Sequence, residues 1–555
     1  MCFLGVDILI FVVTIYVTTN IRSLALSYII ENRSGKYTYL YECESWRNEN
    51  GKVAGKRKII GKIDPTTGEK HYKPEYVERM KSAGTPVKIP ATEKVFSLED
   101  VRKSSVLEHG AFHLLKGISE KTGLADALKE ALPHCWQEVF TLAAHLVVNG
   151  EPFMHCANWI EETESYPVGG MSSQRISELL ATIDPDEREL FYQAWCRHRQ
   201  ESEYLAIDIT SVSSYSELVE DVEWGYNRDG EALPQVNICM LMGEKSRLPV
   251  YQTVYAGSLK DVTTLESTIR RFDRITDGKP VLAVMDKGFY SKLNVDTMLS
   301  GEHARRFVIA VPFTSGFAKK QVDGERKDID TVMNTIHLGG DTLRATTKER
   351  AWGNGRNVYA HIYFSPRKAL GRREDIFGYV SVLRDEAKAE PHRCAKSGKH
   401  KKYLNIRKSE KADSGYTISI REDVVNAALG THGWLVIISN DIADARSAIR
   451  IYRAKDVIEK GFLRLKCDLD LGRLRVHSQD RMQNKVFVGF IALILLSHIN
   501  VVMMDNEMYG KMTMKKMIRT LAKHRIQIIG GERIIYPVTK TQREIYEAFG
   551  VCVPV

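Results

Sequence analysis

The sequence lacks paired cysteines and a strong excess of either charge. Its nine cysteines are scattered singly, their number is odd, and no CxxC motif occurs. This pattern argues against a disulfide scaffold or a zinc ribbon and is typical of reduced cytosolic thiols. Lys and Arg number 79 against 70 Asp and Glu in 555 residues, a net charge of +9. Such a balance permits a polyanionic partner without demonstrating one.

Long hydrophobic runs are also scarce. Residues 8–18 are apolar but too short to cross a bilayer core of about 30 Å. Residues 486–504 carry no acidic or basic side chain other than His498 and are long enough to span one. Because they also contain Ser497 and Asn500 and follow a charged amphipathic stretch, we expect a buried core helix. A membrane-anchored binding protein that uses both runs is the alternative, and fractionation that requires detergent would support it.

Changes in residue pattern divide the chain into segments. The middle of the chain alternates strands and helices, which predicts a mixed α/β sheet flanked by helices. The expected segments are 1–27, an upstream extension or a disordered stretch; 28–95, a small β-meander of three strands and a linker; 96–200, a helical domain that binds DNA; 201–312, the first part of the α/β core; 313–430, a β-rich insertion; 431–505, the second part of the core; and 506–555, a helical tail.

Two stretches of this division have a specific expected structure. Within the insertion, residues 358–363 and 378–383 resemble strands. Within the second part of the core, residues 445–469 are expected to form one continuous helix.

Two basic features outside the core have two readings each. The β-meander carries Lys52, Lys56, Arg57, Lys58 and Lys62, which either protect a solvated sheet edge or contact DNA. The helix that begins near residue 172 presents Arg175 at its head. It is either a recognition helix or an ordinary surface helix of a bundle.

Two aspartates lie in apolar strands of the predicted core. Asp208 is embedded in LAIDITS, and Asp286 ends the hydrophobic run VLAVMD. A buried carboxylate is unfavourable unless it is paired or bound to metal. Ligands of open α/β sheets lie at the carboxyl ends of strands, so the two residues together indicate a site.

A third acidic residue lies on the helix that follows the insertion. At about 100° per residue, Tyr452, Lys455, Glu459 and Lys466 fall within an arc of about 60°. Ordinary i,i+4 pairing explains Lys455 and Glu459, but it does not explain why Tyr452 and Lys466 share their line.

These residues resemble the DDE transposases of bacterial insertion sequences. The resemblance is to the insertion-sequence-four group, whose signature is Y-x2-R-x3-E-x6-K. The matching blocks are Asp208 in its strand, Gly257–Asp261, Asp286 in D-x-G-F-x-S, and the signature residues Tyr452, Lys455, Glu459 and Lys466, with Lys455 in place of the usual Arg. The likeness covers about residues 200–505.

The resemblance implies a fold and an activity. The fold is an RNase H-like core with a mixed five-stranded sheet. Asp208, Asp286 and Glu459 would be catalytic and would bind two Mg²⁺ ions, for which Mn²⁺ can substitute. The enzyme would cut at the terminal repeats of an insertion sequence and join the 3′-OH ends to target DNA. A catalytically inactive protein that binds DNA ends is the alternative.

The resemblance also implies partners and a location. We expect double-stranded DNA as the partner, both as transposon ends and as target, and a homodimer in the synaptic complex. The expected location is the bacterial cytosol, associated with the nucleoid and without a membrane. The side chains expected to contact DNA are Tyr452, Lys455, Lys466, Lys287 and Arg175.

Overall fold

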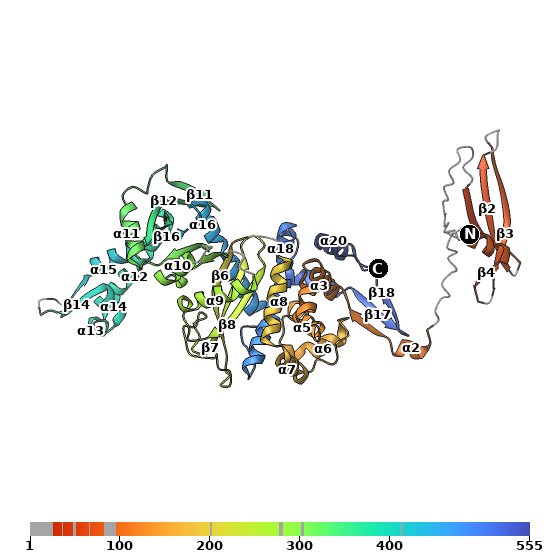
Figure 1. The fold of residues 1–555 in the computed structure, drawn as a ribbon, viewed down its shortest axis with the longest axis horizontal. Coiled ribbons are helices and arrows are strands. Elements are labelled where there is room, and N and C mark those ends of the chain that lie inside the picture. The colour runs from red at the N-terminus through yellow and green to blue at the C-terminus, as the bar shows by residue number, and fades with distance from the viewer. Residues whose placement is uncertain are drawn as a thin grey trace, which may run out of the picture. The chain divides into compact units, whose positions relative to one another are not determined.

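We analysed a computed structural model of the chain. It describes residues 26–35, 37–47, 52–65, 67–82, 96–199, 203–276, 281–300, 305–353, 355–410, 412 and 415–554. The expected extension at 1–27 falls almost entirely outside these residues. Two compact units divide the chain, Met1–Lys103 and Ser104–Val555 (Figure 1).

The first unit contains a four-stranded antiparallel sheet whose strands follow chain order. Its elements are β1 (Leu26–Ser34), β2 (Tyr37–Arg47), β3 (Val53–Ile63), β4 (Lys70–Tyr72), α1 (Pro74–Ser82) and α2 (Leu98–Arg102). The expectation of three strands and a plain linker was therefore incomplete. Both β4 and α1 lie inside the stretch assigned to the linker, and each is too short for its periodicity to stand out.

The second unit is organised by a nine-stranded mixed sheet in the order β11-β12-β13-β16-β10-β9-β6-β7-β8. Its strands are β6 (Leu205–Ser213), β7 (Gln235–Gly243), β8 (Pro249–Ala256), β9 (Leu282–Met285), β10 (Arg306–Val311), β11 (Thr335–Leu338), β12 (Asp341–Gly353), β13 (Arg356–Phe364) and β16 (Trp434–Ser439).

Within this sheet, β6 is the central strand of the part that comes first along the chain. It pairs antiparallel with β7, which pairs antiparallel with β8. On its other side it pairs parallel with β9, which in turn pairs parallel with β10. All nine residues of β7 are buried, as expected for a strand covered on both faces.

Helices from both ends of the chain complete the core of this unit. The N-terminal helices are α3 (Gly110–Lys121), α4 (Leu124–Ala131), α5 (Trp136–Asn149), α6 (Cys156–Glu162), α7 (Ser173–Thr182) and α8 (Pro185–His198). Helices α9 (Asp261–Ile275) and α10 (Lys292–Leu299) connect the strands. Figure 1 shows α18 (Gln479–Asp505), in blue, beside the yellow and orange helices α8 and α5.

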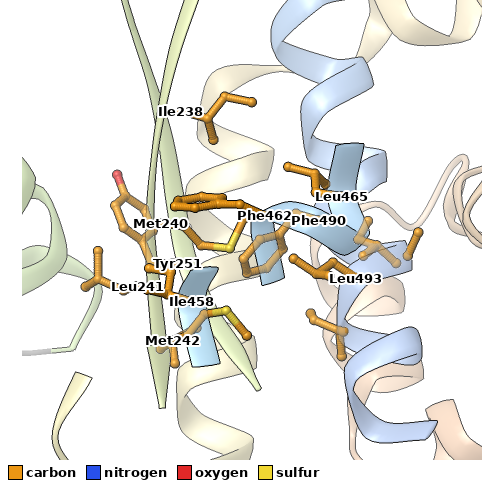
Figure 2. Packing of buried hydrophobic residues seen from close by; sticks show 14 of the residues in the cluster. Ile238, Met240, Leu241, Met242, Tyr251, Ile458, Phe462, Leu465, Phe490 and Leu493 are labelled. Atoms are coloured by element: carbon orange, nitrogen blue, oxygen red, sulfur yellow. The ribbon is translucent and has the colours of Figure 1, made fainter. Parts of the chain in front are cut away.

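The long apolar helix α18 is a core element. By length and composition it could cross a membrane, but 83% of its most apolar window is buried inside the protein. Phe490 and Leu493, from the middle of this helix, are fully buried (Figure 2). Packing within the protein therefore accounts for its apolar sequence, as expected for residues 486–504.

The inserted residues do not form a separate β domain. Strands β11–β13 extend the main sheet through β16, which pairs with both β13 and β10. In the described part of the remainder, the structure is largely helical and includes the hairpin β14–β15. Its elements are α11 (Gly316–Glu325), α12 (Pro366–Ala389), α13 (Pro391–Cys394), α14 (Gly398–Tyr403), β14 (Leu404–Lys408), β15 (Tyr416–Ile420) and α15 (Glu422–Leu429).

The expected strand at 378–383 was wrong, because these residues lie in the middle of α12. The buried residues of this helix, Ile376, Val380, Leu383 and Ala387, recur with a helical period. That period emerges only over a window longer than the six residues that looked like a strand.

The expected single helix at 445–469 was also wrong. The structure contains α16 (Ala445–Ala454), α17 (Asp456–Leu463) and a π-helical turn (Arg464–Asp468). Two tight i→i−3 hydrogen bonds, from Lys455 N to Tyr452 O and from Ile458 N to Lys455 O, mark the first break. A uniform 3.6-residue period does not reveal such local changes of pitch.

The C-terminal residues 506–555 are not only helical. Helices α19 (Met514–Ala522) and α20 (Lys540–Phe549) flank a hairpin of β17 (Arg525–Ile529) and β18 (Glu532–Ile535). Strand β17 also pairs with β5 (Ser105–Glu108), which ties the end of the chain to the start of the helical segment. Four- and five-residue strands are too short to be recognised by alternation alone.

Candidate active site

The register of two neighbouring parallel strands brings Asp208 and Asp286 together. Ile207 of β6 pairs with Met285 of β9, so the next residue on each strand is an aspartate at the same level. Neighbouring strands lie about 4.8 Å apart. The charge of Asp286 raises the pKa of Asp208, which is consistent with this proximity. The two aspartates predicted from sequence therefore lie side by side.

Asp208 is held in a largely dehydrated position. Its side chain is 19% exposed, and its Oδ1 accepts a hydrogen bond of 2.9 Å from the Ile209 N–H. Burial raises the pKa of the Asp208 carboxyl to about 6, although the positive charge of Lys455 opposes this shift. Burial therefore makes the ionised form harder to reach than in water, and protons compete for Asp208 as the pH falls toward this value.

Asp286 ends β9 and is oriented by Tyr452. The Tyr452 hydroxyl, at the C-terminal end of α16, donates a 2.8 Å hydrogen bond to Asp286 Oδ1. Burial, followed by the charge of Asp286, raises the pKa of Tyr452, so the hydroxyl keeps its proton and remains a donor. The charges of Asp208 and Glu459 raise the pKa of Tyr452 further.

Lys455 links the third acidic residue to the two aspartates. Its ammonium Nζ lies 2.9 Å from Glu459 Oε1 and 3.9 Å from Asp208 Oδ2. The separation between Glu459 Oε1 and Asp208 Oδ2 is therefore no larger than the sum of these two distances. Burial lowers the pKa of Lys455, but Asp208, Glu459 and Asp286 outweigh it and the net shift is upward. The lysine is held as a cation between the acidic groups.

The helix that carries Glu459 is fixed by an apolar face. Ile458 and Phe462 pack between β7 and α18 (Figure 2). Helix α17 also approaches β7 closely, since a Cβ at Gly461 would lie 2.5 Å from Met242 Sδ. The Glu459 side chain lies beside this face and is 59% exposed. Packing therefore sets the position of the helix and leaves the carboxylate at the surface.

Lys466 does not join this cluster directly. Its Nζ donates to both carboxylate oxygens of Asp229, at 2.9 and 2.7 Å. Asp229 lies in the segment between β6 and β7. The π-helical turn after α17 changes the helix pitch before Lys466. Tyr452, Lys455, Glu459 and Lys466 were expected along one side of a straight helix, and this change of pitch removes that alignment.

Two charged residues beside the cluster were not identified from sequence. Arg228 forms an ion pair with Asp261, the first residue of α9, and donates a 3.1 Å hydrogen bond to Ser211 on β6. A Cβ at Gly288 would lie 2.9 Å from Asp261 Oδ2, so Asp261 contacts the turn that follows Asp286. Sequence signalled this pair only weakly, through the position of Asp261 in the block Gly257–Asp261.

The remaining predicted DNA contacts lie outside the carboxylate cluster. Lys287 follows Asp286 in the chain and its side chain is exposed. Arg175 lies in the first turn of α7, 3.7 Å from Glu138 on α5. The C-terminal half of α7 packs against α18, where Asn484 donates to the carbonyl of Leu180. Arg175 itself is exposed at the head of this helix.

The donor set fits a divalent cation. Carboxylate oxygens are the ligands that Mg²⁺ and Mn²⁺ prefer, and two of them lie side by side where burial disfavours a bare charge. Within the described residues, no three His, Cys, Asp or Glu side chains form a group close enough to hold a metal ion. Glu459 forms an ion pair with Lys455 instead.

A largely apolar cavity of about 340 Å³ adjoins Tyr452. Trp434, Tyr363 and Leu343 line it from the sheet, and Lys368 and Arg453 add two cations. Trp434 packs against Phe364, with ring centroids 4.8 Å apart. Apolar walls and positive charge beside the acidic cluster suit a nucleobase with its phosphate.

Comparison with known proteins places the whole cluster inside one family. Residues 199–495 match the transposase DDE domain, a stretch that spans more than half of the chain and contains both aspartates, Glu459 and Lys455. The fold is similar to a solved structure, a cryo-EM structure of the piggyBac transposase synaptic complex with hairpin DNA. The identity is 9%, the likeness covers 74% of this chain and 76% of that chain, and the TM-score is 0.36. No curated protein sequence matches. The chain belongs to the family of transposases with a DDE domain, which act in DNA recombination and mobile elements.

Proposed function

We propose that the protein is a DNA transposase of the insertion-sequence-four type. It cuts DNA at the terminal repeats of its element and joins the 3′-OH ends to target DNA. The observation that carries the proposal is the β6–β9 register, which puts Asp208 and Asp286 side by side, with Glu459 held nearby through Lys455. Membership of the DDE family implies an enzyme of the nuclease and transferase class.

The core is proposed to be RNase H-like. The strand order β8-β7-β6-β9-β10, with two antiparallel pairings followed by two parallel ones, supports this assignment. In such a core the first aspartate lies on the central strand and the second at the end of its parallel neighbour. Asp208 and Asp286 occupy these positions.

Two Mg²⁺ ions, or Mn²⁺ in their place, are proposed as cofactors, with Asp208, Asp286 and Glu459 as ligands. A pair of such ions stabilises the attacking and leaving oxygens of an in-line phosphodiester displacement. The protein's own contribution is to hold the ligands in place. β6 and β9 fix the two aspartates, and the Tyr452 hydroxyl orients Asp286.

The basic residues of the signature are proposed to bind the phosphates of the DNA end. Lys455 is paired with Glu459 in this structure, so contact with a phosphate would release the carboxylate to the metal site. Lysine keeps the charge of the usual arginine but cannot make its two parallel hydrogen bonds. Lys466, Lys287 and Arg175 are proposed as further contacts.

The cavity beside Tyr452 is proposed to accept a displaced base at the DNA end. Trp434 lines this cavity and is proposed to stack on the base.

The partners are proposed to be double-stranded DNA, both transposon ends and target, and a second copy of the chain in the synaptic complex. The proposed location is the bacterial cytosol, associated with the nucleoid.

Metal-dependent nicking of a DNA end tests the proposal. Wild type should nick a duplex from the flanking sequence only with Mg²⁺ or Mn²⁺, and Glu459→Gln should abolish nicking. The matched control is Asp456→Asn. This substitution removes another exposed carboxylate of the same helix, one that forms an ion pair with Lys460. Equal loss in both variants, or nicking that survives Glu459→Gln, would contradict the assignment.

A further inference from the structure

The sheet of the first unit has one covered face. Leu40 of β2 and Ile60 of β3 are buried against Tyr76 of α1. Arg79 of α1 forms an ion pair with Glu42 of β2 on the same side. Helix α1 therefore packs on one face of the sheet, and the other face has no helix of the described residues on it.

The opposite face is aromatic and basic. Side chains alternate between faces along a strand, so Tyr37, Tyr39 and Tyr41 of β2 all lie opposite to Leu40. Lys62 of β3 pairs with Tyr39, and its ammonium lies 6.0 Å from the centre of the Tyr37 ring. The guanidinium of Arg57 lies 5.6 Å from the centre of the Tyr41 ring. We call these five side chains the tyrosine face.

Charge is segregated between the two faces. Among the strand residues whose side chains the structure describes, the carboxylates of β1–β4 all lie on the helix-bearing face. They are Glu31, Glu42 and Glu44. Glu31 pairs with Lys70 at 2.7 Å, and Glu44 lies opposite Lys56 in the strand register. Arg57 and Lys62 therefore share their face with no acidic strand residue. Lys56 and Lys58, which are close to them in the sequence, lie on the other face beside glutamates.

We propose that the tyrosine face binds duplex DNA. This inference rests on the proposed function only for the choice of DNA as the polyanion, and it concerns a unit outside the matched residues 199–495. A face with cations and without carboxylates is complementary to phosphates. The outer two of strands β1–β3 lie about 10 Å apart, close to the roughly 12 Å width of the major groove.

A duplex suits this face better than a single strand. Stacking of splayed bases requires open aromatic faces. Here Arg57 and Lys62 lie over two of the three tyrosine rings, and Tyr39 and Tyr41 are half-buried. The groups that project farthest are therefore cations, which contact phosphates, and hydroxyls, which reach base edges.

The strand β3 offers a matched experiment, because its basic residues alternate between the faces. Arg57→Ala with Lys62→Ala removes two cations from the tyrosine face. Lys56→Ala with Lys58→Ala removes two from the helix-bearing face, opposite Glu44 and Glu42. Each double variant is made in the full chain that also carries Asp208→Asn, so that binding is read without cleavage.

The measurement is the affinity for 30-base-pair duplexes from the flanking DNA as a function of salt. The tyrosine-face variant should bind at least tenfold more weakly at 150 mM salt, and the slope of log K against log salt should fall by about 1.8. The helix-face variant should stay within about twofold. Arg57→Lys should restore most of the affinity.

Three outcomes would overturn the inference. The first is equal loss in both double variants, which would mean that charge alone matters. The second is loss confined to single-stranded DNA. The third is dissociation of a dimer by the tyrosine-face variant without DNA, which would make a second copy the occupant. If wild type nicks DNA but the two double variants bind it equally well, this inference alone is refuted. If only the tyrosine-face variant loses binding but wild type does not nick DNA, the proposed function alone is refuted.

Discussion

Two sheets of this protein hold their charged side chains in opposite ways. In the central sheet, Asp208, Asp286 and Lys455 come from distant segments and are largely buried, so each charge depends on the others. In the first unit, Arg57 and Lys62 come from one strand and are exposed. Buried charges interact strongly and specifically, whereas exposed charges act nearly additively and are screened by salt. Substitutions should therefore have large, specific effects in the first case and small, salt-dependent effects in the second.

The largest expected effect is on cleavage. Asp208→Asn or Asp286→Asn should reduce the rate of metal-dependent nicking by about a thousandfold, because a catalytic metal contributes several kcal/mol to transition-state stabilisation. Affinity for the DNA duplex should change by less than about threefold. Single-turnover nicking and a binding titration measure the two quantities. A parallel fall in both would break the contrast between the two sheets.

The next effect is on stability and should be confined to the first unit. Leu40→Ala removes a fully buried side chain from a small core cluster that contains Leu40, Ile60 and Tyr76 among the described residues, at a cost of about 2–5 kcal/mol. Proteolysis within residues 26–82 should increase, while the melting of the unit Ser104–Val555 stays unchanged. Ile29→Ala, at an exposed position of β1, is the control. A common shift of both units would show that they unfold together.

Tyr452→Phe should have an intermediate effect on catalysis. It removes the hydrogen bond to Asp286, which as a bond to a charged group contributes about 1.5–3 kcal/mol. The nicking rate should fall about 10- to 100-fold with the affinity for DNA nearly unchanged. A rate equal to that of wild type would show that β9 orients Asp286 by itself.

Nicking should also depend on pH through Asp208. Its carboxyl has a pKa raised to about 6 by burial, so the protonated, inactive fraction grows as pH falls below this value and the rate should rise with pH up to a plateau. Lys455 lowers the pKa of Asp208, so Lys455→Met should move the midpoint to higher pH. Lys460→Met, on the exposed side of α17, should leave the midpoint unchanged. A midpoint that moves down in Lys455→Met would contradict the arrangement.

The smallest effect is expected on the tyrosine face. Lys62→Ala alone should weaken DNA binding about twofold to fivefold and lower the salt slope by about 0.9, as for one phosphate contact. The effect should disappear at high salt, where exposed charges are screened. A loss that persists at high salt would mean that Lys62 acts through packing on Tyr37 instead.

The central strands and the two aspartates could be predicted from sequence because their signals are local. The apolar runs around Asp208 and Asp286 mark buried strands whatever their partners. The breaks around Lys455 and before Lys466 could not be predicted, because they depend on how α17 packs against β7 and α18. The Arg228–Asp261 pair was missed for a similar reason, since its members lie 33 positions apart and follow no period.

The tyrosine face shows a different limit. Sequence identified five basic residues between 52 and 62 but not which of them act together. The strand register divides them between the two faces and pairs Lys56 and Lys58 with glutamates. Side chains of a β-strand point alternately to the two faces, and a bulge with one extra residue shifts this alternation. The faces of β3 can therefore be assigned from sequence only once the bulge at Ile60 is known.

Sequence alone indicated Asp208, Asp286 and Glu459 as candidate residues, because apolar strands around acidic residues and a spaced signature are local features of the sequence. Tertiary structure decided which of these residues meet. A parallel register, one close glycine contact and a change of helix pitch bring together side chains far apart in the chain, such as Asp208 and Lys455, whose charged atoms lie 3.9 Å apart. Electrostatic interaction in a dehydrated site varies steeply over such distances, so the properties of the site follow from packing that no linear pattern encodes.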